Sequence, residues 1–279
     1  MTAPTAGPFG ARLADAVAAR GPVCVGVDPH AALLDAWGLP DDPAGLERFA
    51  LSATEALAPH VAALKPQSAF FERHGSRGVA VLERVVATAR EAGCLVVLDV
   101  KRGDIGSTSQ AYADAYLDPR SPLASDAVTV SPYLGTGSLD PFVTTARAHG
   151  AGLFVLAFTS NPEGPQFQSA TTARGRSVGG EVLDHLRALN AGEEHGSFGA
   201  VVGATVGETG ETYDVGGPLL VPGVGAQGGT VDDVRRVFGA AAHRVVPSTS
   251  REVLAAGPDP AALRDAAART NDAFAGLVR

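Results

Sequence analysis

The sequence predicts a single α/β domain over residues 1–279, folded as a (β/α)8 (TIM) barrel with an extra N-terminal helix. Short apolar runs rich in β-branched residues alternate with amphipathic stretches along the whole chain. The apolar runs are nearly continuous, which is typical of parallel strands covered on both faces. Eight such runs within about 250 residues match this barrel. A doubly wound open sheet is the alternative, although it usually has fewer strands.

The order of elements follows from these runs. Helices are expected between the strands, and two more are expected outside the repeating units, at residues 8–20 and in DPAALRDAAARTNDAFAGLV near the C-terminal end. Thr230 is the expected N-cap of one helix, because two aspartates follow it in the first turn. Residues 206–218 are too short and glycine-rich for a full helix. The expected strands are 23–28, 61–67, 94–101, 126–132, 152–158, 199–205, 219–225 and 243–248.

Composition excludes several classes of partner. The net charge of −8 argues against a nucleic-acid-binding or anionic-membrane surface, which would need a basic face. The sequence contains neither an apolar run of about 20 residues nor the pattern of a signal peptide. Cys24 and Cys94 lie in apolar runs, so we expect buried free thiols. A cytoplasmic location is the resulting prediction.

Charged residues follow three neighbouring strands of the predicted barrel. Asp28 ends the first, Lys65 the second, and Asp99 and Lys101 the third, with Asp104 just beyond. Asp99 and Lys101 are two residues apart and therefore point to the same side of a strand. Strands in a sheet lie about 4.8 Å apart, so Lys65 can reach the same patch. The catalytic groups of such barrels come from this end of the strands.

Taken singly, these residues have structural explanations. Asp28 before Pro29 could begin a turn, Lys65 could be a peripheral strand-end lysine, and Asp104 could cap the next helix in competition with Ser107. A buried ion pair, however, is a poor stabiliser. Together, three charged strand ends favour a functional site.

The last two strands are followed by residues suited to an anion. PGVGAQGGT (222–230) is a glycine-rich loop that opens a helix, and it includes Gln227 and Gly228. Arg251 follows the eighth strand, where its guanidinium can bind phosphate through two hydrogen bonds. These barrels often bind phosphate after strands seven and eight, although a plain turn is the alternative. We find no set of residues with metal-ligand spacing. The residues thus indicate an enzyme acting on a small phosphorylated molecule.

These motifs resemble those of the orotidine 5′-phosphate decarboxylase family, specifically its larger bacterial subfamily. DVKRGDIGST (99–108) is similar to that family's D-x-K-x-x-D-I-x-x-T signature, and the resemblance spans nearly the whole chain. The other matching stretches are GVDP, LKPQSAFFE, SPYLG, TSNPEG and PGVGAQGG.

The resemblance implies conversion of orotidine 5′-phosphate to uridine 5′-phosphate in pyrimidine biosynthesis, with no metal and no cofactor. Lys101 is then the proton donor to C6 of the pyrimidine, and Asp99 lies against the substrate carboxylate. Lys65 orients Asp99 and contacts the ribose, and Asp28 binds a ribose hydroxyl. Asp104 belongs to the same charge network, but reaches the site of the other subunit of a homodimer.

The resemblance also implies the contacts to the rest of the substrate. Thr108 lies beside the shared aspartate, and Ser160 contacts the pyrimidine. Gln227 and Gly228 of the glycine-rich loop, together with Arg251, hold the phosphate.

The chemistry suits these residue types. Loss of CO₂ leaves negative charge at C6, which a fixed cation can stabilise and a lysine, unlike an arginine, can protonate. The chain has 22 lysines and arginines, of which only Lys65 and Lys101 are lysines. Neighbouring aspartates should keep both charged.

Two alternatives remain open from the sequence. A metal-dependent sugar-phosphate lyase or synthase of the same superfamily would need carboxylate ligands at the strand ends, but Lys65 occupies the end of the second strand. A non-catalytic phosphate-ligand-binding barrel would bind its ligand without turnover.

Overall fold

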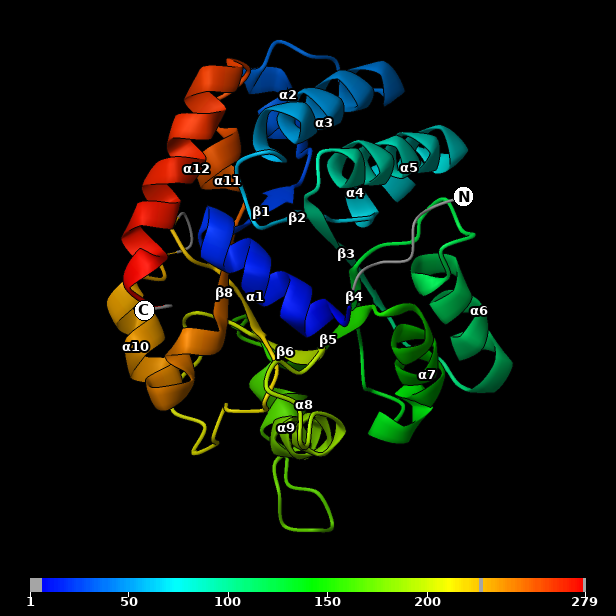
Figure 1. The fold of residues 1–279 in the computed structure, drawn as a ribbon, viewed down its shortest axis with the longest axis vertical. Coiled ribbons are helices and arrows are strands. Elements are labelled where there is room, and N and C mark those ends of the chain that lie inside the picture. The colour runs from blue at the N-terminus through cyan, green and yellow to red at the C-terminus, as the bar shows by residue number, and fades with distance from the viewer. Residues whose placement is uncertain (1–6, 226–227, 278–279) are drawn as a thin grey trace.

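Eight parallel strands close into a barrel in a computed structural model that describes residues 7–225 and 228–277 (Figure 1). The strands follow one another in sequence order, and β8 pairs with β1 to close the sheet. The predicted fold class is confirmed, and each expected strand is present. The strands are β1 (Cys24–Val27), β2 (Ala63–Pro66), β3 (Leu95–Arg102), β4 (Ala127–Val130), β5 (Gly152–Phe158), β6 (Phe198–Val202), β7 (Leu219–Pro222) and β8 (Val245–Thr249).

Helices surround the barrel and connect its strands (Figure 1). Residues 203–218, between β6 and β7, contain no helix, as their length and glycine content predicted. The α-helices are α1 (Phe9–Arg20), α2 (Ala31–Ala36), α3 (Pro43–Leu57), α4 (Ala69–Glu72), α5 (Gly75–Glu91), α6 (Gly106–Leu117), α7 (Asp140–His149), α8 (Pro165–Gln168), α9 (Val178–Leu189), α10 (Val231–Phe238), α11 (Arg251–Leu254) and α12 (Pro260–Phe274). Short 3-10 helices are η1 (Thr136–Leu139), η2 (Gly239–Arg244) and η3 (Ala275–Leu277).

Local sequence explains where several helices begin. Thr230 caps α10 as predicted, because its hydroxyl accepts from Asp233 N while the Asp233 carboxylate accepts from Thr230 N. Asp42 caps α3 by accepting from two backbone amides. At α6, by contrast, the N-cap is Ile105, which has no side-chain cap, so neither Asp104 nor Ser107 has that role.

The barrel interior is apolar at one end. Inward-facing residues nearer the amino-terminal ends of the strands, such as Cys24, Val97 and Phe154, form one buried cluster with Phe9 and Leu13 of α1. The predicted N-terminal helix therefore closes the amino-terminal end of the barrel (Figure 1).

Because side chains alternate along a strand, the next inward positions form the layer above this apolar cluster. On β2 and β3, the residues that follow Ala63 and Val97 on the same face are Lys65 and Asp99. The charged residues thus lie at the carboxyl end of the barrel.

A second, larger cluster fills the space between the barrel and its helices. Cys24 and Cys94 are both buried and free, as predicted. Within residues 7–225 and 228–277, none of the helices combines the length and the apolar character that a bilayer span requires.

Candidate active site

A cavity of about 240 Å³ opens at the carboxyl end of the barrel. Its lining brings together five of the residues that the sequence singled out: Asp28, Lys65, Asp99, Lys101 and Arg251. Asp28 follows β1, the other three acidic or lysine residues lie on β2 and β3, and Arg251 begins α11 just after β8; the strands β8, β1, β2 and β3 are adjacent in the closed sheet.

Asp99 is the centre of the charge network. Its Oδ2 accepts a hydrogen bond from Lys65 Nζ at 3.1 Å, and its Oδ1 accepts one from Lys101 Nζ at 2.5 Å. The Asp99 and Lys65 side chains are only 7% and 8% exposed, whereas that of Lys101 is 42% exposed. One carboxylate therefore links a buried ammonium group to one that faces the cavity.

Burial and charge act in opposite directions on these groups. Burial disfavours the charged form of Lys65, but Asp28 and Asp99 outweigh it and raise the pKa of Lys65 above its ordinary value. Burial likewise disfavours ionised Asp99, but Lys65 and Lys101 outweigh it and hold the pKa of Asp99 well below its usual range. Lys65 is thus ammonium and Asp99 carboxylate at neutral pH.

Asp28 lies on the other side of Lys65 and is 6% exposed. Its Oδ1 is buried and has no hydrogen-bond partner in the described part of the chain, which leaves an acceptor available to a ligand. Gly26 makes room for it, because a Cβ there would lie 2.8 Å from both Asp28 Oδ2 and Ser250 Cβ. The hydroxyl oxygens of Thr249 and Ser250 are also buried without a described partner.

The predicted phosphate-binding end is only partly within the described residues. Gln227 lies outside them. Gly228 has a φ of 87°, which suits glycine, and its amide donates to Gly225 O at 2.7 Å. Arg251 is exposed, lines the cavity and has no carboxylate partner among the described residues. Within the described part of the chain, no ion pair of its guanidinium would therefore compete with an anion.

Four predicted residues of the described chain are not part of the cavity lining: Gly228, Asp104, Thr108 and Ser160. Asp104 is half-buried and its Oδ1 accepts from Ile105 N, while Thr108 is exposed on α6. Ser160 is exposed beyond β5 and packs against Gly203. Its neighbour Thr159 lines the cavity instead.

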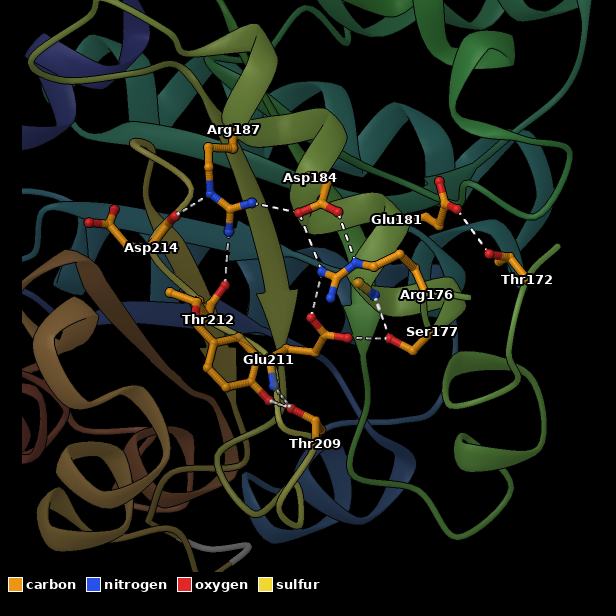
Figure 2. Close-up of polar contacts among 12 residues, drawn as sticks. Thr172, Arg176, Ser177, Glu181, Asp184, Arg187, Thr209, Glu211, Thr212 and Asp214 are labelled. Carbon is orange, nitrogen blue, oxygen red and sulfur yellow. Dashed lines mark hydrogen bonds and ion pairs between the residues drawn. The ribbon is translucent and has the colours of Figure 1, made fainter. Parts of the chain in front are cut away.

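Polar contacts join residues 172–177, in the long segment after β5, to α9 and to residues 209–214 (Figure 2), and none of these residues lines the cavity. Glu211, whose side chain is 7% exposed, accepts from Arg176 Nη2 at 2.7 Å and from Ser177 Oγ at 2.6 Å. Arg187 of α9 donates to Thr212 O at 3.1 Å and to Asp184 Oδ1 at 2.6 Å. These bonds tie the segment and α9 to the helix-free connection between β6 and β7.

Several cavity residues were missed by the sequence reasoning. Gln67, Thr129 and Thr159 line the cavity together with an apolar wall that includes Leu156 and Val201. Thr129 donates to Asp99 Oδ1 at 2.8 Å. Strict alternation along β4 could have placed Thr129 inside the barrel, two residues after the inward-facing Ala127.

The described side chains that could bind a metal ion are not grouped in a way that suits one. Across residues 7–225 and 228–277, His, Cys, Asp and Glu do not form any group of three or more that could hold one. The carboxylates of the cavity are instead close to ammonium groups, which compete with a cation.

The fold and the cavity define a (β/α)8-barrel protein with lysine and aspartate groups at the carboxyl ends of β1 to β3. After β8 it has an arginine that forms no ion pair with the described residues. Residues 21–266 match the model of the orotidine 5′-phosphate decarboxylase / HUMPS family. The chain belongs to this family.

Relatives cover the chain almost completely. It is 68% identical over 269 residues to an orotidine 5′-phosphate decarboxylase of Nocardioides, covering 95% of this chain and 98% of the relative. It is 50% identical over 275 residues to one from Corynebacterium glutamicum, covering 97% and 99%. A crystal structure from Streptomyces avermitilis matches with a TM-score of 0.96 and 62% identity over 98% of this chain and 97% of that one.

Proposed function

We propose that this protein decarboxylates orotidine 5′-phosphate to uridine 5′-phosphate, the reaction for which its curated relatives are named. The observation that carries the proposal is the Lys65–Asp99–Lys101 network within the cavity. The family model also includes other enzymes, but the relatives at 50% and 68% identity are all named decarboxylases. A cytoplasmic location is part of the same proposal.

In the proposed reaction, Lys101 acts on C6 of the pyrimidine. The bond from C6 to the carboxylate breaks, CO₂ leaves, and the electron pair stays on C6. The Lys101 ammonium stabilises that negative charge and then gives it a proton, and the resulting amine regains a proton from water. Lys101 suits this role because its amine is exposed to the cavity, while Asp99 holds it by a hydrogen bond.

The remaining roles follow from position. In this proposal Asp99 lies against the substrate carboxylate, and Lys65, which donates to Asp99 Oδ2, keeps that residue ionised and oriented. Asp28 accepts a hydrogen bond from a ribose hydroxyl through its unpartnered Oδ1. Arg251 binds the phosphate with the glycine-rich loop, including Gln227 and Gly228.

Ser160, as part of the proposal, contacts the pyrimidine from the segment after β5. Its exposed position next to the cavity-lining Thr159 supports this role.

We further propose a homodimer in which Asp104 and Thr108 complete the partner's site. Both residues lie outside the cavity of their own chain. Large apolar side chains are exposed at the same end of the barrel, with Ile105 61%, Tyr133 76% and Leu134 51% exposed. Such exposure suits an interface between subunits.

The test of function is the loss of ultraviolet absorbance of orotidine 5′-phosphate on addition of the purified protein, with and without EDTA. We expect turnover that the chelator does not change. Turnover abolished by EDTA and restored by a divalent metal ion would contradict the metal-free proposal. A folded protein that binds the nucleotide without turnover would contradict the decarboxylase itself.

The shared site is tested by mixing two inactive variants, Lys101→Ala and Asp104→Ala, and letting the subunits exchange. Half of the dimers formed at random are hybrids, and each hybrid has one intact site, so about a quarter of wild-type activity should return. Lys101→Ala mixed with Lys65→Ala is the matched control: both residues belong to the same subunit's site, and no activity should return. The absence of recovery in the first mixture would argue against a shared site.

A further inference from the structure

Thr129 stands at the point where β3 departs from regular strand geometry. The register between β3 and β4 shifts between Leu98, which pairs with Val128, and Arg102, which pairs with Val130. The backbone amides of β3 within this bulge therefore need other hydrogen-bond acceptors. Thr129, 1% exposed, is the β4 residue opposite the bulge.

The Thr129 hydroxyl supplies that acceptor. Its Oγ1 accepts from Val100 N and from Lys101 N, each at 3.0 Å. A hydroxyl has two acceptor positions and one proton. Since both acceptor positions face amides, the proton is left for Asp99 Oδ1, at 2.8 Å. The whole hydrogen-bonding capacity of Thr129 is thus used on the segment from Asp99 to Lys101.

Lys101 has a backbone conformation that needs such support. Its φ is 46°, and it is the one non-glycine residue with a positive φ among those described. This region is unfavourable for a residue with a Cβ, so the surroundings must hold the backbone there. The same segment carries the amine that contacts Asp99 Oδ1 at 2.5 Å.

We propose that Thr129 is a positioning residue whose hydroxyl holds both the Asp99 carboxylate and the backbone of Lys101 in their working geometry. The inference rests on the proposed decarboxylase function for its kinetic test, and on the geometry alone for its structural test. The hydrogen bond from Thr129 is among the contacts that keep the pKa of Asp99 low, after those from the two lysines. Thr129 itself need not touch the reacting atoms.

The kinetic test compares Thr129→Val, which keeps the volume and loses the hydroxyl, with Thr129→Ser, which keeps the hydroxyl. We expect Thr129→Val to lower kcat about 10- to 100-fold with KM little changed, because Asp99 and Lys101 lose their alignment. Thr129→Ser should recover most of kcat. Equal loss in both variants would assign the effect to packing of the methyl group and overturn the proposal, as would wild-type kcat in Thr129→Val.

Matched controls come from buried threonines elsewhere in the fold. Thr54 of α3 and Thr270 of α12 each donate a side-chain hydrogen bond to a helix carbonyl four residues earlier. Substitution of either by valine should leave kcat unchanged. If Thr129→Val does not fold, as judged by circular dichroism, Thr129→Ala takes its place with the same expected loss.

A second readout does not depend on activity. The chain has only two lysines, so protein labelled with ¹³C-lysine should give two assignable side-chain signals. We expect Thr129→Val to shift the Lys101 signal, and Thr129→Ser and Thr270→Val to leave it in place. An unmoved Lys101 signal in Thr129→Val would overturn the proposal even if the wild-type protein proved not to be a decarboxylase. Lack of turnover in the wild type, with the signal shift intact, would instead overturn only the proposed function.

Discussion

Two regions of this protein use charge in different ways. At the ends of β2 and β3, two lysines share one buried aspartate inside the cavity. Between α9 and the connection from β6 to β7, the cations are arginines whose forked side chains each bind several carboxylate or carbonyl oxygens (Figure 2). The first region lines a cavity, and the second holds surface segments together.

The comparison shows what each cation can contribute. Arginine binds two acceptors in a fixed geometry and does not lose its proton near neutral pH, which suits an anchor. Lysine carries a point charge and a proton that can be transferred. In a chain with only two lysines, both occupy the cavity, whereas arginines carry the anchoring ion pairs. The difference predicts that the two regions respond differently to substitution.

The largest expected effect is on the chemistry of the lysine site. Lys101→Ala should lower kcat by about 10⁴-fold or more, because it removes both the cation at C6 and the proton donor. Lys101→Arg is the sharper control, since it keeps the charge but cannot supply the proton. The measurement is steady-state decarboxylation, and substantial activity in either variant would contradict the assignment of the proton donor.

Removal of the central carboxylate should affect stability with a defined pH dependence. Asp99→Asn leaves Lys65 buried beside one fewer anion, and we expect a loss of about 3 kcal/mol in the free energy of unfolding near neutral pH. The pKa of Asp99 is lower in the folded protein than in the unfolded chain, where it is about 3.9. The stabilisation that ionised Asp99 gives to the folded state is therefore complete above a pH of about 3.9, and it is lost as the pH falls through the pKa of the folded protein.

The stability gap between wild type and Asp99→Asn should therefore narrow in acid, as measured by urea unfolding over a range of pH. Asp184→Asn is the control from the arginine network, since its side chain is 46% exposed. Its effect should stay below about 1 kcal/mol. A gap that widens in acid would contradict the direction of the Asp99 pKa shift.

An intermediate effect is expected at Arg251, an arginine at the cavity that lacks a described ion pair. Arg251→Ala should weaken binding of uridine 5′-phosphate about 10- to 100-fold, because a charged hydrogen bond to the phosphate is lost, and should hardly affect uridine. Titration calorimetry with both ligands measures this. Arg147→Ala, outside the cavity, is the matched control, and equal losses for both ligands would exclude Arg251 from phosphate binding.

The smallest effect is expected in the arginine network itself. Glu211→Gln removes the charge that pairs with Arg176, and one side-chain acceptor is replaced by a donor. We expect a loss of about 1 kcal/mol in the free energy of unfolding and faster tryptic cleavage after Arg174 and Arg176, with kcat unchanged. A fall in kcat similar to that of Lys101→Ala would show that the two regions are not separable.

Much of the fold was predictable because its signals are local. Continuous apolar runs identified the eight strands, and the glycine-rich segment at residues 206–218 correctly indicated a connection without a helix. The cap at Thr230 was also predicted, from the two aspartates that follow it in the first turn, and in the structure Asp233 forms a capping box with it. Such features depend on neighbours in the chain rather than on the closed barrel.

The site was predictable in its charged members and not in its neutral ones. Asp28, Lys65, Asp99 and Lys101 stood out because charge at the end of an apolar strand is costly unless it is used. Thr129 did not, since a β-branched residue inside a strand is ordinary. Its importance depends on a register shift between two strands, which no local pattern shows.

The sequence by itself determined the succession of strands and helices along the chain, the burial pattern and the types of charged residue available for chemistry, because period and residue type are properties of a single segment. The tertiary structure decided which of those residues meet. It brought Lys65 to Asp99, placed Thr129 against the bulge that holds Lys101, and left Asp104 outside its own chain's cavity. These contacts depend on the register and closure of the sheet, and a shift of one residue would turn each of these side chains to the opposite face.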